Sequence, residues 1–316
     1  MNTNVELIKT LCNRWKDEAL NENGSIMIGK SEAFRLINNG IAMHELTIKE
    51  LEVCCIELTQ LLLLSGMNTI ISEDHQWFWA WIGEIVNNRN INYFNKENER
   101  EIKELFSICI RSTLAGIEKP PRSHYESLER FNYRKAHPLE HNLNELNMNK
   151  SLILSYISFP LLEGILKKFC SEYVLLSGKV IKNFKVVRGR GKGYEKSYTK
   201  GKFINSIQDL LLLVIQIVGD TQLVEDLKII LEHIGQLDKE NTKDPCKIIY
   251  DWRNSSLHGE TSYSTIGGTI LNIAIIIILH SIEDTYNKNL SNILDHVRWN
   301  IETKCMSPLA FYPPYL

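Results

Sequence analysis

Glycine and proline are scarce in this sequence, with 17 and 8 residues among 316. Residues that favour helix, above all Leu, Glu and Lys, are abundant instead. The hydrophobic content of 44% and the charged content of 23% are typical of an ordinary globular protein. We therefore predict an all-α fold, long enough for two domains that each bury a core.

Cysteine pairs with the spacing of a metal or redox site are absent. The seven cysteines are odd in number and scattered, without a C-x-x-C pair, which argues against a disulfide framework and a zinc site. We expect buried free thiols in a reducing compartment. The first ten residues, MNTNVELIKT, lack the apolar segment of a secretory signal. We therefore predict a cytoplasmic protein that uses neither a metal nor a cofactor.

Charged residues are absent from Thr261 to Ile282, and the segment 273–279 (IAIIIIL) is intensely apolar. A membrane span would need ~20 consecutive apolar residues, and polar residues interrupt this stretch before that length is reached. They are Ser262, Ser264, Thr265, Thr269, Asn272 and His280. We predict the fully buried central helix of a bundle, and a membrane span is the alternative.

Apolar residues recur at helical spacing along most of the chain. The predicted helices cover about 4–20, 46–65, 72–86, 96–117, 150–176, 203–218, 221–236, 244–258, 261–282 and 288–304. The aromatic tail from Met306 to Leu316 contains Pro313 and Pro314 and is not helical. We expect it to dock on this protein or on a partner.

Residues 117–149 are polar and are broken by three prolines, which is typical of a linker. We therefore divide the chain into an N-terminal helical domain (1–116), this linker (117–149) and a C-terminal helical domain (150–316). Within the linker, HPLEH (137–141) matches an inverted zinc-protease pattern. Pro138 fits only the first turn of a helix and no third ligand is suggested, so we predict a loop, and a metal-dependent hydrolase is the alternative.

The segment 179–202 concentrates positive charge, with nine Lys or Arg residues and a single acid, Glu195. Val180–Val187 and Tyr194–Thr199 predict a short β-hairpin insertion, within 180–199, around the turn RGRGKG. Cations interleaved with aromatic residues suit a phosphate backbone and unstacked bases. The predicted RNA-binding residues are Lys182, Lys185, Arg188, Arg190, Lys192, Lys196 and Lys200. A flexible charged insertion is the alternative.

The stretch 248–260 (IIYDWRNSSLHGE) places Arg253, Asn254 and His258 on one short helix that ends at Gly259. The histidine can transfer a proton near neutral pH, and the guanidinium can stabilise phosphoryl oxygens. Asn254 lies four positions before His258 and can orient its ring or the phosphate. The structural alternative is a surface pair of Arg253 with Asp251, with His258 as a polar helix end.

Glu163 lies within the broad apolar face of the helix predicted at 150–176. It is either an exposed glutamate or an acid that orients a basic site residue from a neighbouring helix. We therefore include Glu163 as a supporting residue of the site around Arg253.

The segment RNSSLH (253–258) resembles the motif of ribonucleases of the HEPN superfamily, in which an Arg and usually a polar residue precede a His. The resemblance covers about 150–285. It implies a four- or five-helix bundle and metal-independent endoribonuclease activity, in which the RNA 2′-OH attacks the phosphorus and leaves a 2′,3′-cyclic phosphate. A toxin or an antiviral-defence effector is the implied role.

Arg253 and His258 are five residues apart, about 140° around a helix, so one helix presents them poorly to one phosphate. The resemblance implies a homodimer that joins two such helices in a composite site. It also implies a regulatory or antitoxin partner, although Glu260 stands where some relatives carry a modified tyrosine. The alternative function is a non-catalytic HEPN domain that binds RNA or nucleotide, or that scaffolds a complex.

Overall fold

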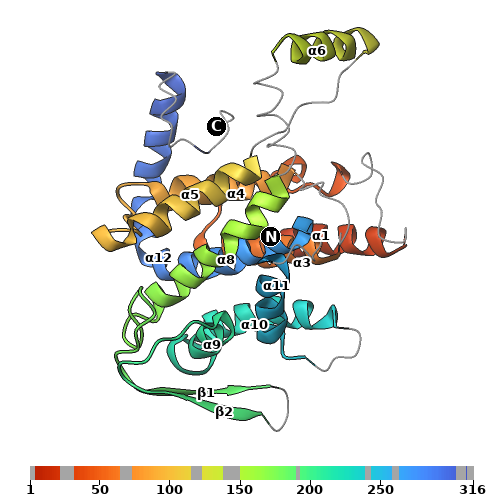
Figure 1. Ribbon diagram of the computed structural model, residues 1–316. Coiled ribbons are helices and arrows are strands. Elements are labelled where there is room, and N and C mark those ends of the chain that lie inside the picture. The colour runs from red at the N-terminus through yellow and green to blue at the C-terminus, as the bar shows by residue number, and fades with distance from the viewer. Residues whose placement is uncertain are drawn as a thin grey trace.

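The computed structural model describes residues 4–21, 32–64, 73–114, 123–137, 150–189, 193–238, 243–257, 263–303 and 311. These residues form ten α-helices and one small hairpin, so the all-α prediction is confirmed (Figure 1). The helices are α1 (Asn4–Asn21), α3 (Ile48–Leu64), α4 (Glu73–Asn87), α5 (Arg100–Leu114), α6 (His124–Ala136), α8 (Lys150–Phe169), α9 (Ile207–Leu213), α10 (Thr221–Gln236), α11 (Pro245–Leu257) and α12 (Tyr263–Glu302). The strands are β1 (Phe184–Arg188) and β2 (Tyr194–Tyr198).

Helix α12 is the axis of the core, because α8, α3, α4 and α10 all pack against it. Two adjacent glycines allow close contacts with α8 and α3. A Cβ atom on Gly267 would lie 2.8 Å from the backbone nitrogen of Ser155 in α8. One on Gly268 would lie 2.9 Å from the Leu62 side chain in α3. A larger residue at position 267 would push α8 away, because the clash is with backbone, whereas at position 268 the Leu62 side chain would have to move.

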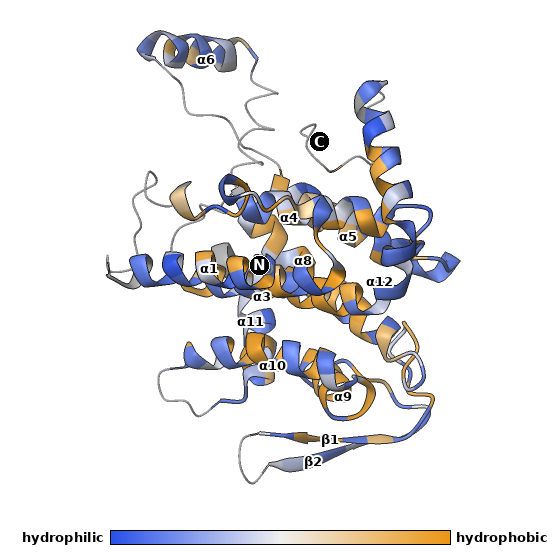
Figure 2. Ribbon diagram, turned by 180° about the vertical axis from the view of Figure 1, so that it is seen from behind, coloured by the Kyte–Doolittle hydropathy of each residue, from blue (hydrophilic) through white to orange (hydrophobic). Residues whose placement is uncertain are grey.

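The apolar half of α12 forms the orange centre of the molecule in Figure 2. By length and composition, the region from Ile266 to Asn300 qualifies as a candidate membrane span, but 83% of its most apolar window is buried within the fold. This burial supports the core helix that the sequence predicts. Hydrogen bonds within the core also support packing of α12 against protein rather than lipid. Asn272 Oδ1 accepts from Trp79 Nε1 at 2.7 Å, and Asn272 Nδ2 donates to Thr59 Oγ1 at 2.9 Å.

The two predicted domains share one apolar core. Buried residues form a continuous cluster from Ile8 in α1 to Phe311 near the C-terminus. Helices α3 and α5 of the first half pack directly on α12 and α8 of the second. Phe311 also contributes to this core, since its side chain is buried and lies against Gly83. The boundary at 117–149 therefore does not separate two hydrophobic cores.

Three elements differ from the sequence prediction. Helix α12 continues to Glu302, whereas two helices were predicted, because no Gly or Pro interrupts it after Gly268. Helix α8 ends at Phe169 rather than near 176. Helix α6 lies inside the predicted linker, and none of its described side chains is buried. The linker's remaining residues, 117–122 and 138–149, lie outside the described part of the chain.

Candidate functional site

Helix α11 carries the predicted catalytic motif and begins as its sequence indicates. Asp244 Oδ1 accepts a hydrogen bond from the backbone N–H of Cys246 at 3.0 Å, and Pro245 occupies the first helical position. Ile248 and Ile249 are buried and anchor the helix, which packs on α8, α9 and α10. The helix is thus fixed on one face, and its last turns carry Arg253 and Asn254.

Arg253 is held at both ends of its guanidinium group. Its Nη2 lies 3.1 Å from Glu163 Oε2 in α8, and its Nη1 donates to the backbone oxygen of Asn205 at 3.3 Å. The Arg253 side chain remains 30% exposed. Since a guanidinium carries five N–H donors, these two contacts orient the group and leave donors for an anion.

Glu163 binds two cations from different directions. Its Oε1 accepts from Lys167 Nζ, one turn later in α8, at 2.7 Å, while its Oε2 faces Arg253. The carboxylate is mostly shielded, with 16% of the side chain exposed. The structure therefore places Glu163 where it orients a basic residue of a neighbouring helix; its catalytic role stays a prediction.

Asn254 is half-buried beside Arg253, and its side chain forms no hydrogen bond with the residues that the structure describes. His258 lies outside the described residues, as does Gly259. The structural alternative for Arg253 proposed a different partner. Asp251 instead lies against Lys247 and, at 3.7 Å, Lys243, so the expected pair of Arg253 with Asp251 is absent among these described residues.

The hairpin is antiparallel, with Phe184 opposite Tyr198 and Arg188 opposite Tyr194. The observed strands are shorter than the predicted ones, 184–188 and 194–198 against 180–187 and 194–199. Alternate residues of β1 are buried, and this face packs on α9. The Phe184 and Tyr198 rings stack with centroids 4.9 Å apart. One face of the hairpin is therefore a core surface.

A buried aspartate of α9 forms ion pairs with two of the predicted RNA-binding cations. The Asp209 side chain is fully shielded and accepts hydrogen bonds from Arg188, from Lys196 Nζ at 2.9 Å, and from the Tyr198 hydroxyl. Burial alone would raise the pKa of Asp209, but these hydrogen bonds outweigh it and hold the pKa below its ordinary value. Arg188 and Lys196 thus anchor the hairpin to α9.

A glutamine adds a second anchor. Gln216 lies in the π-helical turn Val214–Val218 that follows α9. Its side-chain amide accepts from the Val187 N–H and donates to the Val187 carbonyl oxygen, both at 2.9 Å. This pairing occupies the hydrogen-bonding groups of an edge strand, which would otherwise be open to another chain.

The remaining cations of the hairpin differ in availability. Lys182, Lys185 and Lys200 are exposed, although Lys185 lies 2.8 Å from Glu195, and Lys182 lies over the Tyr173 ring at 4.4 Å. Arg190 and Lys192 lie outside the described residues. Lys179 and Lys202 are also exposed. The surface open to a polyanion is therefore formed by lysines.

Sequence reasoning missed Asp209, Asn205 and Lys167. A signal existed for Asp209, which is the single acid of the apolar segment 207–218. Strand periodicity also places Arg188 and Lys196 on the same face as buried Val186 and Tyr198. Nothing in the sequence marks the backbone oxygen of Asn205 as a partner.

The zinc-protease pattern finds no structural support among the residues described. The His137 ring stacks on Tyr133 at 4.2 Å, and its Nδ1 lies 2.9 Å from the Tyr133 carbonyl oxygen; residues 138–141 lie outside that part. Within the described ranges, no group of three His, Cys, Asp or Glu could hold a metal ion. The described cysteines are free and buried, and burial raises the pKa of Cys170 to about 12.

Comparison of the chain with protein-family models, with curated proteins and with solved structures finds no match.

Proposed function

We propose that this protein is a metal-independent endoribonuclease whose catalytic residues are Arg253, Asn254 and His258. The observation that carries the proposal is the orientation of Arg253 by Glu163 and Asn205 while part of its guanidinium remains open. A group held in this way stabilises developing negative charge without reorganising during the reaction. The resemblance of RNSSLH to the HEPN motif supplies the reaction type.

In the proposed reaction, the RNA 2′-OH attacks the adjacent phosphorus and the bond to the 5′ oxygen of the next nucleotide breaks. His258 transfers the proton, because its ordinary pKa lies near neutrality. Arg253 contacts the non-bridging oxygens through the donors that Glu163 and Asn205 leave free. Asn254, without a described partner, is available to orient the phosphate or the histidine ring.

The proposal includes a homodimer, in which two copies of α11 face each other and each composite site takes Arg253 from one protomer and His258 from the other. The exposed lysines 182, 185 and 200 then guide the RNA backbone towards it. A toxin or antiviral-defence role, and a partner that restrains cleavage, belong to the same proposal.

A non-catalytic RNA- or nucleotide-binding domain, or a scaffold, is the second candidate. The ion pair itself favours it, since Glu163 partly neutralises the charge of Arg253 and joins α8 to α11. If Arg253 serves only this contact, neither the wild type nor any Arg253 variant cleaves RNA.

The deciding experiment is incubation of the full-length protein with mixed RNA in EDTA. We expect cleavage that persists under chelation and is lost in Arg253→Ala and in His258→Ala. The matched control is Arg100→Ala, whose exposed guanidinium pairs with Glu104 one turn away. Substrates with 2′-deoxyribose should remain intact, because they lack the nucleophile. Equal background cleavage by wild type and both variants would refute the nuclease and leave the binding domain.

The composite site has its own test. Mixing inactive Arg253→Ala and His258→Ala proteins under exchange conditions should restore up to about a quarter of the activity, if each site takes its Arg and His from different protomers. No restoration, together with a monomer by analytical ultracentrifugation, would refute the shared site.

A further inference from the structure

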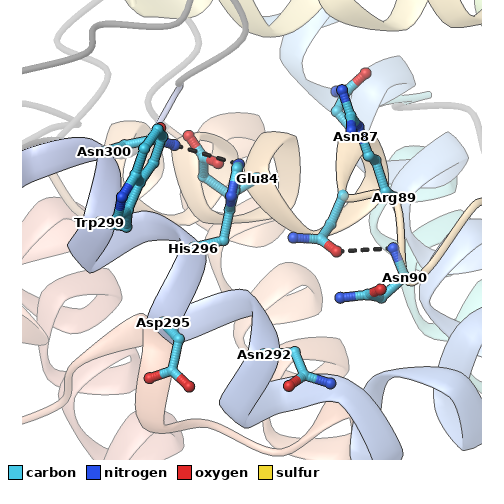
Figure 3. Close-up of a pocket in the computed structure, with 10 residues that line it drawn as sticks. Glu84, Asn87, Arg89, Asn90, Asn292, Asp295, His296, Trp299 and Asn300 are labelled. Atoms are coloured by element: carbon cyan, nitrogen blue, oxygen red, sulfur yellow. Dashed lines mark hydrogen bonds between the residues drawn. The ribbon is translucent and has the colours of Figure 1, made fainter. Parts of the chain in front are cut away.

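A large polar pocket lies between the C-terminal end of α4 and the last turns of α12 (Figure 3). Its volume is ≈ 780 Å³, which is within the range of small-molecule binding sites. Glu84, Asn87 and Arg89 come from α4 and the residues after it. Asn292, Asp295 and Trp299 line the pocket from α12. None of the predicted site residues that the structure describes lines this pocket.

The α12 side of the pocket is a regular stripe of polar residues. Asn292, His296 and Trp299 recur at helical spacing and so lie on one face. This face is exposed, whereas Ile293 and Val297 of the same helix are buried. It is polar apart from Trp299, whose side chain is 52% exposed. The exposed indole offers a flat surface inside a polar cavity.

Several polar groups of the pocket have hydrogen-bonding capacity to spare. Some amides are already engaged: Asn88 Oδ1 accepts from the Asn90 N–H at 2.9 Å, and Asn300 Nδ2 contacts His296 Nε2 at 3.3 Å. The side chains of Arg89 and Asn292, by contrast, form no hydrogen bond or ion pair with the described residues. Donors and acceptors are therefore available to a ligand.

The charges of the pocket limit the ligand. Glu84 and Asp295 are acidic, and Arg89 is the single arginine or lysine among the described lining residues. Two carboxylates disfavour a di- or triphosphate, whereas one guanidinium is enough for one phosphate. Five asparagines line the cavity, and the side chains of Asn90 and Asn292 form no hydrogen bond with the described residues. An amide side chain presents a donor and an acceptor side by side, which matches the edge of a nucleobase.

We propose that this pocket, the α4–α12 pocket, binds the base of a nucleotide, either a free mononucleotide or a residue of single-stranded RNA. The base stacks on Trp299, its edge bonds to asparagine amides, and its single phosphate contacts Arg89. Asp295 accepts from an exocyclic amino group, so adenine is preferred over uracil. This inference does not depend on cleavage, because its test measures binding alone.

Isothermal titration of the full-length protein with AMP, UMP and ribose 5-phosphate tests the proposal. We expect AMP to bind at millimolar concentration or tighter, UMP several-fold more weakly, and ribose 5-phosphate not at all. Oligo(A) and AMP then distinguish the two sources, since the tighter of the two identifies the physiological form. Equal binding of ribose 5-phosphate and AMP would refute recognition of the base, as would the absence of AMP binding at millimolar concentration.

Variants locate the ligand. Trp299→Ala should weaken AMP binding about tenfold through loss of stacking, and Asn292→Ala about fivefold. Asn292 is exposed and without a described partner, so its variant should fold normally. The control is Tyr125→Ala, an exposed aromatic on α6 outside the pocket. If AMP binds Trp299→Ala and Asn292→Ala as tightly as wild type, the ligand lies elsewhere and the proposal fails.

Discussion

Two carboxylates in this protein each hold cations from other elements, but they leave those cations in different states. Asp209 is fully shielded and binds Arg188, Lys196 and the Tyr198 hydroxyl. Glu163 sits nearer the surface and holds Arg253 by one edge of the guanidinium. The first arrangement uses its cations to fix a hairpin, whereas the second orients a cation that still has free donors. Positive charge in the sequence is therefore not the same as charge available to RNA.

The largest effect is expected at Asp209. Asp209→Asn keeps the shape but leaves two cations at a buried site without a charged partner, which should lower the free energy of unfolding by ~3–5 kcal/mol. The measurement is denaturant unfolding at neutral pH. Glu104→Gln removes the exposed partner of Arg100 and should change stability by less than ~1 kcal/mol. Similar losses of unfolding free energy in Asp209→Asn and Glu104→Gln would show that the buried carboxylate stabilises the fold no more than an exposed one.

The stability that Asp209 contributes should decrease at acid pH. Because the folded-state pKa of Asp209 is lowered, its contribution is complete above the unfolded pKa near ~4 and is lost as the pH falls below that value. The stability difference between wild type and Asp209→Asn should therefore narrow below pH ~4. A difference that widens on acidification would contradict the charged anchor.

The second effect concerns the catalysis proposed for Arg253. Arg253→Ala should lower single-turnover cleavage by roughly 10²–10³-fold, because it removes a donor to the developing phosphoryl charge. Binding of a 2′-deoxy substrate analogue, followed by fluorescence anisotropy, should weaken only a few-fold. If binding and cleavage fall by the same factor, Arg253 acts on RNA as an ordinary phosphate contact, as a hairpin lysine does.

The third effect concerns the exposed lysines. Replacement of Lys182, Lys185 and Lys200 together by Ala should reduce the slope of log binding constant against log salt by about two, since each phosphate contact on a single strand contributes ~0.7. Thermal stability should hardly change, because all three side chains are exposed. An unchanged slope would show that RNA does not follow the hairpin.

The smallest effect is expected at Glu163. Glu163→Gln keeps a hydrogen-bond acceptor for Arg253 but loses the charge, so cleavage should fall about tenfold while RNA binding is retained. Glu99→Gln is the matched control. Glu99 is buried and binds Lys168 of α8, the helix that carries Glu163, at 2.6 Å, and it does not contact Arg253. Loss of stability in Glu163→Gln without loss of cleavage would assign Glu163 to packing alone.

The sequence was a good guide to the fold and a partial one to the site. Helix α10 lies at 221–236 as predicted, because its apolar residues recur regularly and Asp220 caps it. The predicted division of α12 into two helices was wrong. The polar residues after Ile282 resemble a helix boundary, but the helix continues there and only becomes more exposed to solvent. The polar pocket that α12 forms with α4 was missed for a related reason: its lining residues each look like ordinary surface residues.

The sequence by itself determined the all-α class, the hairpin and the placement of Arg253 and Asn254 on one short helix. These features follow from periodicity, turn residues and capping, all of which act between near neighbours. Only the tertiary structure decided which carboxylate receives which cation, that Arg188 and Lys196 are occupied, and that Arg253 has Glu163 rather than Asp251 as its partner. Such pairings join residues far apart in the chain, and packing of whole helices sets them.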